Sequence, residues 1–362
     1  MYSCSTRRKT PRAIAVLLLC LLVLAVSACE WTDLVDGDDD EDDDSNSDNT
    51  PPATETRVPG LSVAVSSSDF QTTSDTLVDS INASANFVAL ARIDHQANAG
   101  SSSSLRPTTV VLFDDANRSS PLILADPRVA LDLPARVLVY RDSENDIGVA
   151  YTNGDYLDAR YDLGDAEDGA LDGFDADIET LVNDVAGDDP SSGAASGVSE
   201  GEGIESVESS QDFNSTINAL IDAIESRTEL TRLDPIDFQA RSTRNGVNPN
   251  TLMIFGNPDA GTPLIRASQT TGVDLPQKML VSQADDGTVT IYYNDPGFIA
   301  DRHDITGRDD EIDAIGDLLA DLADEAAGNG STSGSASTNA ANGSTNATEA
   351  ATTDQSGASA TP

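Results

Sequence analysis

The sequence predicts an α+β fold made of two tandem domains, each with an antiparallel sheet that carries its helices on one face. First, a stretch occurs twice: residues 109–151 match residues 251–293 without a gap, so that Phe113 and Phe255 lie 142 positions apart. Second, each copy contains short β-rich runs separated by turn signals, which favours strands joined by hairpins. Third, each copy contains two segments with the 3.6-residue apolar period of helices. Strands joined by hairpins indicate α+β architecture rather than a doubly wound sheet.

Composition then divides the 362-residue chain into six segments. We predict a lipoprotein signal peptide at 1–28, an acidic disordered tether at 29–59, a first repeat domain at 60–186, a flexible linker at 187–203, a second repeat domain at 204–327 and a disordered tail at 328–362. The tether, linker and tail contain many Gly, Ser, Asp or Asn residues. They have too few apolar side chains to form a hydrophobic core.

Each domain is expected to open with a strand and a helix. Residues 61–66 and 204–208 alternate apolar and polar side chains, as strands do. Ser67–Ser68 and Ser210 are predicted helix caps. The second helix shows the apolar face most clearly, at positions i, i+4, i+7, i+8 and i+11, namely Phe213, Ile217, Leu220, Ile221 and Ile224.

Four more strands and a closing helix are expected in each domain. The strands lie around residues 88–93, 109–113, 137–140 and 147–151 in the first domain, and 230–238, 251–255, 278–281 and 289–293 in the second. Residues 114–120 and 256–262 are predicted turns. An Asp286-Gly287 pair predicts a tight hairpin. The closing helices carry apolar side chains at helical spacing, from Phe174 to Val185 and from Ile312 to Leu322.

The chain is strongly acidic, and its negative charge limits the kinds of partner that it is expected to bind. The formal net charge is −43 and the sequence pI is about 4.1. Such a surface repels nucleic acid, so we expect no nucleic-acid partner. Lysine occurs only at Lys9 and Lys278. Acidic residues crowd the predicted domains as well as the tether, which favours adaptation to high salt, where screening reduces self-repulsion. Equal or greater stability in dilute buffer would contradict that interpretation.

The N-terminus predicts a lipid-anchored envelope protein. A basic segment (Arg7, Arg8, Lys9 and Arg12) precedes 13 apolar residues, and Val26-Ser27-Ala28-Cys29 follows. This pattern is typical of a bacterial lipoprotein signal, with Cys29 as the lipidated residue. In Gram-negative lipoproteins, which this segment resembles, Asp after the cysteine favours retention in the inner membrane. Glu30 follows Cys29 here, and the absence of Asp favours the outer membrane. The other cysteines, Cys4 and Cys20, also precede the domains, so no disulfide, thiol nucleophile or cysteine-based metal site is expected within them.

The repeated motifs resemble the domain of unknown function 302 family. In the second copy the resemblance rests on Phe255-Gly256-Asn257-Pro258, Gly261-Thr262-Pro263-Leu264, Asp274-Leu275-Pro276, Tyr293-Asn294-Asp295 and Arg302-His303. The first copy matches through Ile93-Asp94-His95, Leu105-Arg106-Pro107-Thr108, Asp132-Leu133-Pro134 and Arg160. It departs at Asp114-Asp115-Ala116, where the family has Gly-Asn-Pro. The resemblance implies a strand, helix, four strands and helix of the TATA-binding-protein-like class, and it brings no reaction, cofactor or catalytic residue.

The two histidines are candidate ligand-binding residues. Each aligns with an aromatic residue of the other copy: His95 with Phe238, and His303 with Tyr161. Phe can neither ligate a metal nor move a proton, so a mechanism that uses both histidines in each domain is disfavoured. Packing of a flat ring explains the exchange more simply. A composite His95/His303 site between the domains is the alternative, and we predict no metal site because no third strong ligand stands out.

Three further residues complete the candidate ligand-binding set. Arg160 and Arg302 occupy matching positions and are suited to clamp a carboxylate or phosphate. A structural salt bridge is the competing interpretation, because the chain is rich in Asp. Asn257 lies in a Gly-rich segment, 256–261, whose backbone amides could hold an anion, although a plain turn is the favoured interpretation.

No catalytic motif stands out, so we predict no catalytic residue and no cofactor, and we favour a binding or interaction module in the cell envelope. The alternative is an enzyme, or a protein that processes a small anionic ligand through the arginine of each domain. The expected partners are membrane lipid at Cys29 and either an envelope protein or a small anionic ligand. Pairing of sheet edges between copies of the chain is a third hypothesis.

Overall fold

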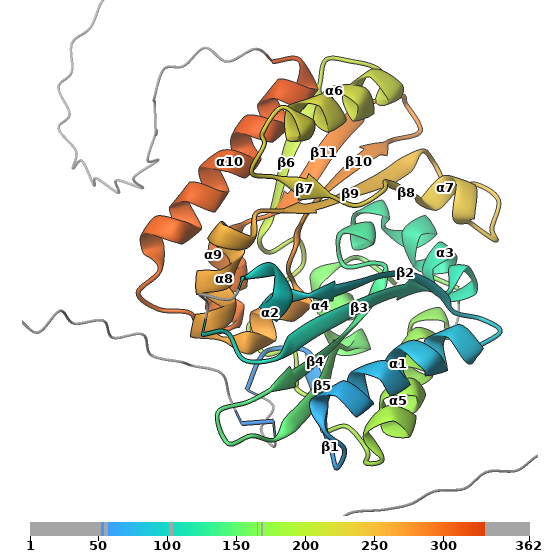
Figure 1. The fold of residues 1–362 in the computed structure, drawn as a ribbon. Helices are drawn as coiled ribbons and strands as arrows, with labels where there is room; N and C mark the ends of the chain where they lie inside the picture. The colour runs from blue at the N-terminus through green and yellow to red at the C-terminus, as the bar shows by residue number, and fades with distance from the viewer. Residues whose placement is uncertain (1–51, 54–56, 101–103, 165, 168, 330–362) are drawn as a thin grey trace, which may run out of the picture. The chain divides into compact units, whose positions relative to one another are not determined.

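The fold is described from a computed structural model, which places residues 52–53, 57–100, 104–164, 166–167 and 169–329. The predicted signal peptide, Cys29, most of the acidic tether and nearly all of the tail lie outside these residues. Both repeats belong to one compact unit of the chain. Figure 1 shows the two sheets, one from each repeat, with their helices.

The first repeat forms a five-stranded antiparallel sheet in the order β1-β5-β4-β3-β2. Its strands are β1 (Leu61–Ser66), β2 (Val88–Asp94), β3 (Thr108–Asp114), β4 (Ala135–Arg141) and β5 (Ile147–Thr152). Its helices are α1 (Phe70–Ala83), α2 (His95–Asn98), α3 (Ala116–Ala125), the 3-10 helix η1 (Pro127–Leu131), α4 (Gly154–Arg160) and α5 (Ala170–Ala186). The α+β prediction is therefore confirmed.

The second repeat has the same order, β6-β11-β10-β9-β7, with β8 also paired to β9. Its strands are β6 (Ile204–Ser209), β7 (Thr231–Arg232), β8 (Ile236–Asp237), β9 (Asn250–Gly256), β10 (Gln277–Gln283) and β11 (Val289–Asn294). Its helices are α6 (Phe213–Glu225), α7 (Phe238–Arg241), α8 (Pro258–Ala267), η2 (Gln269–Val273), α9 (Pro296–Arg302) and α10 (Asp309–Ala327).

The edge strand next to β9 is the main difference in sheet topology. In the first repeat β2 is one strand with an irregularity between Ala89 and Ala91. In the second repeat the equivalent edge is split into β7 and β8, separated by residues 233–235. Pro235 lies in the break, and a proline has no N–H to donate to a ladder.

Two local predictions were wrong in detail. The first helix of each repeat is capped by an aspartate, Asp69 or Asp212, whose carboxylate accepts a backbone N–H, and not by the preceding serines. The predicted turns at 114–120 and 256–262 are instead the starts of α3 and α8. Asn, Asp and Pro favour helix caps and first turns as well as turns, so composition alone did not separate the two.

The linker and the end of the tether also differ from expectation. Residues 187–203 were predicted to be flexible, but Ser191 pairs with Val63 and the N–H of Gly193 donates to the carbonyl of Leu61, 3.2 Å away. The linker thus extends along the free edge of β1. At the other end, Val58 is buried, so the predicted tether stops before residue 59.

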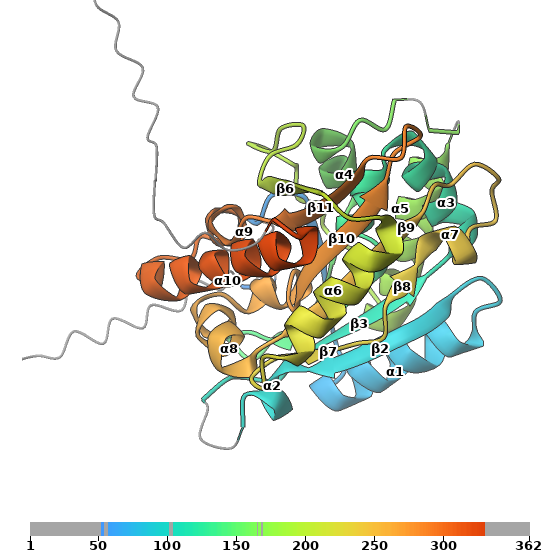
Figure 2. The same cartoon turned by 90° about the horizontal axis from the view of Figure 1, so that it is seen from above.

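The two faces of each sheet have different neighbours. Helices α1 and α5 pack together on one face of the first sheet, and α6 and α10 do the same on the second. Figure 2 shows α6 beside α10. On the other side, η2 contacts β3, β4 and β5, while η1 contacts β9, β10 and β11. Each repeat therefore inserts its 3-10 helix against the sheet of the other, and the functional candidates lie around that junction.

Candidate functional site

Arg160 and Arg302 end two short helices, α4 and α9, that the sequence did not predict. Both side chains are buried, at 0% and 5% exposure. Arg160 Nη1 donates to Asp132 Oδ2 at 2.8 Å, and Arg302 Nη1 donates to Asp274 Oδ2 at 2.7 Å. The aspartates belong to the matching Asp-Leu-Pro motifs, so each repeat builds the same buried ion pair.

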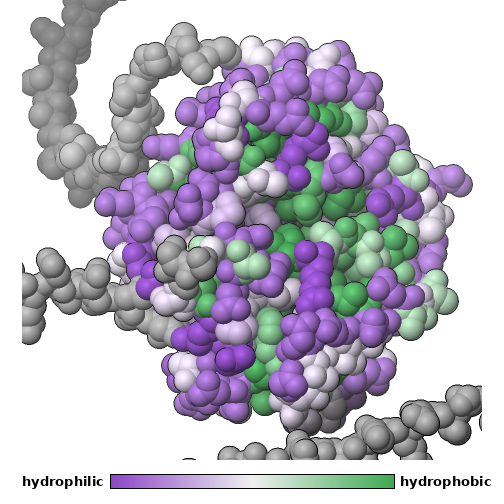
Figure 3. Space-filling model, in the orientation of Figure 1, coloured by the Kyte–Doolittle hydropathy of each residue, from purple (hydrophilic) through white to green (hydrophobic). Residues whose placement is uncertain are grey.

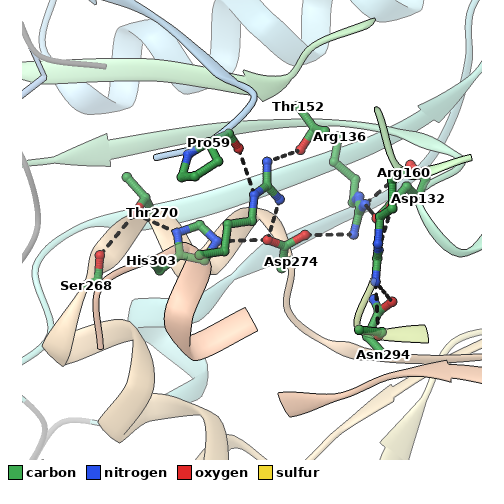
Figure 4. Close-up of polar contacts among 12 residues, drawn as sticks. Pro59, Asp132, Arg136, Thr152, Arg160, Ser268, Thr270, Asp274, Asn294 and His303 are labelled. Atoms are coloured by element: carbon green, nitrogen blue, oxygen red, sulfur yellow. Dashed lines mark hydrogen bonds and ion pairs between the residues drawn. The ribbon is translucent and has the colours of Figure 1, made fainter. Parts of the chain in front are cut away.

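Each guanidinium also forms a hydrogen bond to the other repeat. Arg160 Nη2 donates to Asn294 at 2.9 Å, and Arg302 Nη2 donates to Thr152 at 3.3 Å. Arg302 Nε also donates to the carbonyl of Pro59 at 3.0 Å. Asn294 and Thr152 occupy matching positions at the ends of β11 and β5. The two repeats are therefore joined by a two-fold arrangement of bonds, much of which is visible in Figure 4.

Each guanidinium also lies over an aromatic ring of the other repeat. The Cζ atom of Arg302 lies 4.0 Å from the ring centre of Tyr156, and that of Arg160 lies 4.6 Å from the ring centre of Phe298. Tyr156 and Phe298 are matching residues of α4 and α9. A guanidinium over a ring face adds attraction when the pair is removed from water.

The two carboxylates stay ionised although they are buried. Burial by itself would raise the pKa of Asp132, but Arg160, Lys278 and Arg136 outweigh burial and hold the pKa well below its usual range. For Asp274, burial is outweighed in the same way by Arg302 and by the hydrogen bond from His303, so its pKa is also low. Each carboxylate therefore serves as the anionic centre of one half of the junction.

Two further cations occupy matching positions in β4 and β10. Arg136 Nη2 donates to Asp132 Oδ1 at 3.0 Å, whereas Lys278 Nζ lies 3.8 Å from Asp132 Oδ1 and makes no hydrogen bond to the described residues. Burial, and then the nearby Arg136 guanidinium, lowers the pKa of Lys278 to about 7. This pair was not predicted from the sequence, although a charged side chain inside an apolar strand is a usable signal.

His303 and Tyr161 occupy matching positions, and each forms a hydrogen bond to the aspartate of its own repeat. His303 Nε2 donates to Asp274 Oδ2 at 2.8 Å, and Tyr161 Oη donates to Asp132 Oδ2 at 2.7 Å. The second ring nitrogen, Nδ1, lies 2.9 Å from Thr270 Oγ1. Burial lowers the pKa of His303 despite Asp274, so the ring is neutral at pH 7. The difference between His303 and Tyr161 that the sequence shows therefore preserves both the packing and the hydrogen bond to the aspartate.

These contacts show how three of the candidate ligand-binding residues are used. Arg160, Arg302 and His303 lie inside the junction of the two repeats, where their polar atoms bond to other residues of the chain. The structure agrees with the salt-bridge interpretation of the two arginines. It gives no support to a clamp for an external carboxylate or phosphate.

His95 and Asn257, the other two candidates, line a pocket of about 450 Å³ between the repeats. The first repeat contributes residues from the end of β2 and the start of α2. The second contributes residues from β7, the end of β9, α8 and α10. Apolar residues dominate the lining: Ile93, Leu230, Leu233, Ile254, Phe255, Pro258, Ile265, Leu275, Pro276, Ile315 and Leu318. In Figure 3 apolar surface gathers in this region, near β7 and β9.

The polar residues of the pocket come from both repeats. They are Arg92, Asp94, His95, Asn98, Thr231, Arg232, Asn257, Thr262 and Gln277. Arg92 is paired with Asp75 and Arg232 with Glu225, so both cations already have an acidic partner. Asn257 Oδ1 accepts from the N–H of Asp259, where it caps α8. Its amide nitrogen has no hydrogen-bond partner among the residues that the structure places, so it is available as a donor.

The matching region of the first repeat is filled by larger side chains. Phe87 occupies the position of Leu230 and packs on Phe113, with ring centres 4.9 Å apart. Arg118 occupies the position of Ala260 and pairs with Asp177 at 2.7 Å. It lies over Gly173, where a Cβ would meet its guanidinium. At these matching positions the second repeat therefore has the smaller side chains, and both of them line the pocket.

The described part of the chain lacks two other kinds of feature. No cluster of three or more His, Cys, Asp or Glu side chains suited to hold a metal ion occurs there. Within the same residues, no helix is both long and apolar enough to cross a bilayer.

Part of the chain is similar to curated proteins of other organisms. The "Fluoride-specific ion channel FluC 1" of Brucella suis biovar 1 is 39% identical over 66 residues, which cover 18% of this chain and 26% of that protein. "Fluoride-specific ion channel FluC 2" of Brucella melitensis biotype 1 is also 39% identical over 66 residues and 24% of its length. This chain thus spans about a quarter of the curated relatives that it matches.

Among solved structures, a DUF302 protein from Bacillus stearothermophilus is 18% identical, with a TM-score of 0.31, over 34% of this chain and 98% of that one. The di-domain ARO/CYC StfQ of the steffimycin biosynthetic pathway is 9% identical, with a TM-score of 0.18, over 74% of this chain and 95% of that one. The family model described as "Domain of unknown function DUF302" matches residues 61–181 and again 205–325, which is more than half of the chain. The chain therefore belongs to the DUF302 family and carries two tandem copies of its domain.

Proposed function

We propose that this chain is a lipid-anchored protein of the cell envelope whose two repeats together bind a small, mainly apolar ligand. The pocket between the repeats carries this proposal. It has a volume of about 450 Å³, an apolar lining and a few polar groups drawn from both repeats. These are the usual properties of a small-molecule site.

The asymmetry of the repeats supports the same conclusion. A repeat that only supports the fold does not require a pocket. At the matching positions the first repeat has the larger residues Phe87 and Arg118. The second repeat places Leu230 and Ala260 there instead. Burial of an apolar ligand against such a surface is favourable in proportion to the area removed from water.

The binding test uses N-phenyl-1-naphthylamine, an apolar dye that fluoresces when it leaves water. We expect saturable binding to the wild-type chain in high salt. Leu230→Phe and Ala260→Arg place first-repeat residues in the pocket and should each weaken binding at least tenfold. Ala314→Arg adds the same charge to the exposed side of α10 and serves as the control. Equal binding by all four proteins would refute the pocket as the site.

The envelope location is proposed from the N-terminal sequence alone. The basic segment, the apolar run and Val26-Ser27-Ala28-Cys29 support lipidation at Cys29. Stable attachment requires more than one acyl chain, which a lipidated N-terminal cysteine of this kind provides. A Cys29→Ser variant should leave the membrane fraction. If it still sediments with membranes, the lipid anchor is wrong, whatever the outcome of the dye experiment.

A further inference from the structure

His95 stands where β2 ends and α2 begins, and it is only 7% exposed. Its Nε2 atom lies 3.1 Å from the carbonyl oxygen of Gly272, in η2 of the second repeat. A carbonyl oxygen only accepts hydrogen bonds, so Nε2 must carry the hydrogen. In a neutral ring the other nitrogen, Nδ1, is then an acceptor.

The ring of His95 is neutral under ordinary conditions. Burial lowers its pKa to about 4, although the Gly272 carbonyl and Asp94 act in the opposite direction. The charged groups that flank it at the pocket are already engaged: Asp94 caps the N–H of Ala97, and Arg92 is bonded to Asp75. At pH 7, therefore, Nδ1 presents a lone pair and no proton.

Within the described residues Nδ1 has no hydrogen-bond partner. Contact with η2 involves the opposite edge of the ring, because a Cβ placed on Gly272 would lie 3.3 Å from His95 Cδ2. Since His95 also lines the pocket, Nδ1 is positioned for a group within it. A ligand that covers Nδ1 without bonding to it would leave an acceptor unsatisfied, so a ligand that donates a hydrogen bond to it is favoured.

The second repeat shows that the fold does not require this nitrogen. Phe238 begins α7 as His95 begins α2, and both helices are capped by an aspartate at the preceding position. Phe238 is just as buried. An aromatic ring without polar atoms therefore satisfies the packing at this position, and the imidazole nitrogen is free to have another role.

We propose, on the basis of the binding function above, that the ligand is an uncharged apolar alcohol or phenol whose hydroxyl group donates a hydrogen bond to Nδ1 of His95. The absence of charge follows from the pairing of Arg92 and Arg232 with Asp75 and Glu225, which leaves their charges balanced. The amide nitrogen of Asn257 supplies a donor for the hydroxyl oxygen or for a second polar group. The rest of the lining contacts the hydrocarbon body.

The test compares two probes of similar shape, 2-naphthol and 2-methoxynaphthalene, of which only the first has a hydroxyl hydrogen. Binding to the full chain is measured at pH 7 in high salt, by displacement of N-phenyl-1-naphthylamine. We expect the wild type to bind 2-naphthol about tenfold more tightly, the effect of one net hydrogen bond. His95→Phe should abolish that preference and leave the affinity for 2-methoxynaphthalene unchanged.

His303→Tyr is the matched control, because it also replaces a histidine by its counterpart in the other repeat but lies outside the pocket. It should keep the tenfold preference. A second measurement follows the ¹⁵N chemical shift of His95 Nδ1, which should change with 2-naphthol and not with 2-methoxynaphthalene.

The outcomes separate this proposal from the one on which it rests. Equal affinity of the wild type for the two probes would overturn recognition by His95 while leaving the pocket as a binding site. The same conclusion would follow if His95→Phe weakened both probes equally, since the ring would then act by packing alone. Dye binding that ignores Leu230→Phe and Ala260→Arg would instead overturn the pocket itself.

Discussion

The two repeats match at their polar junction but differ around the pocket that lies between them. At the junction, matching positions hold the same kinds of group: Asp132 and Asp274, Arg160 and Arg302, and a cation in each inner strand. Around the pocket, matching positions hold different groups, such as Phe87 and Leu230. A two-fold junction constrains both repeats at once, because each contributes to the surroundings of the other. The pocket is lined by different elements of each repeat, so it is free of that two-fold constraint, and this is where a duplicated domain can acquire a function.

The largest effect is expected from breaking the shared feature. Asp274→Ala removes the partner of Arg302 and His303 and leaves a buried guanidinium without its carboxylate. Loss of one member of a buried ion pair costs about 3–5 kcal/mol of unfolding free energy. Urea unfolding in high salt measures it, and Asp132→Ala should cost a similar amount if the junction is two-fold.

The control for that prediction is an exposed pair. Glu325 on α10 pairs with Arg227 at 3.2 Å while remaining about half exposed. Glu325→Gln should change the unfolding free energy by less than about 1 kcal/mol. A similarly small effect of Asp274→Ala would show that the junction contributes little to stability.

The next effect concerns pH and distinguishes His95 from Phe238. The pKa of His95 falls from its ordinary 6.5 to about 4 on folding, so the unfolded chain binds more protons between these values. The contribution of His95 to the unfolding free energy is therefore complete above pH 6.5. It decreases as the pH falls, by about 2 kcal/mol at pH 5. His95→Phe should flatten this part of the stability profile, as followed by denaturant midpoints from pH 8 to 5.

His303→Tyr should flatten the same profile in the same direction, because burial also lowers the pKa of His303. Unchanged slopes in both variants would mean that neither histidine is held neutral by the fold.

A smaller effect, of opposite sign, is expected at Lys278. Its ammonium group is buried beside Arg136 and makes no hydrogen bond to the described residues. Lys278→Met should therefore raise the unfolding free energy by about 1–2 kcal/mol at pH 7. Arg136→Met should lower it, because the Arg136 guanidinium donates to Asp132.

The gain at Lys278 should depend on pH. Folding lowers the pKa of Lys278 from 10.5 to about 7, so the wild type becomes more stable as the pH rises through that window. The advantage of Lys278→Met should shrink toward pH 10. A gain that is constant with pH would show that burial of the charge is not its cause.

The smallest effect is expected where the repeats differ most. Phe87→Leu removes a ring pair and should cost about 1 kcal/mol. Leu230→Phe fills existing space in the pocket, so its effect on stability should stay below that. Thermal unfolding of the two variants measures the difference. Equal and large losses would mean that the space around Leu230 is already closely packed.

Much of the architecture was predictable because it follows from local periodicity and from the duplication. The strand at 61–66 and the two closing helices lie where alternation and the 3.6-residue period place them. The break of the edge strand at residues 233–235 was not predicted, although Pro235 inside the apolar run is a signal for it. Helices α3, α4, α8 and α9 were also missed, because they are short and begin with residues that favour turns as well.

The candidate site was predicted only as a set of residue types. The sequence singled out Arg160, Arg302, His303, His95 and Asn257, and the structure divides them between a buried junction and a pocket. Their partners, Asp132 and Asp274, were noticed only as parts of a motif. No pattern along the chain indicates which side of a sheet will meet another domain.

By itself the sequence determined the fold class, the duplication and the acidic character, because these depend on spacing and composition. Only the tertiary structure decided that the two repeats pack through their charged residues and that a pocket opens on one side. Those outcomes depend on contacts between residues more than a hundred positions apart, such as Arg302 with Thr152 and His95 with Gly272. Local periodicity contains no information about such pairs, since it describes one element at a time.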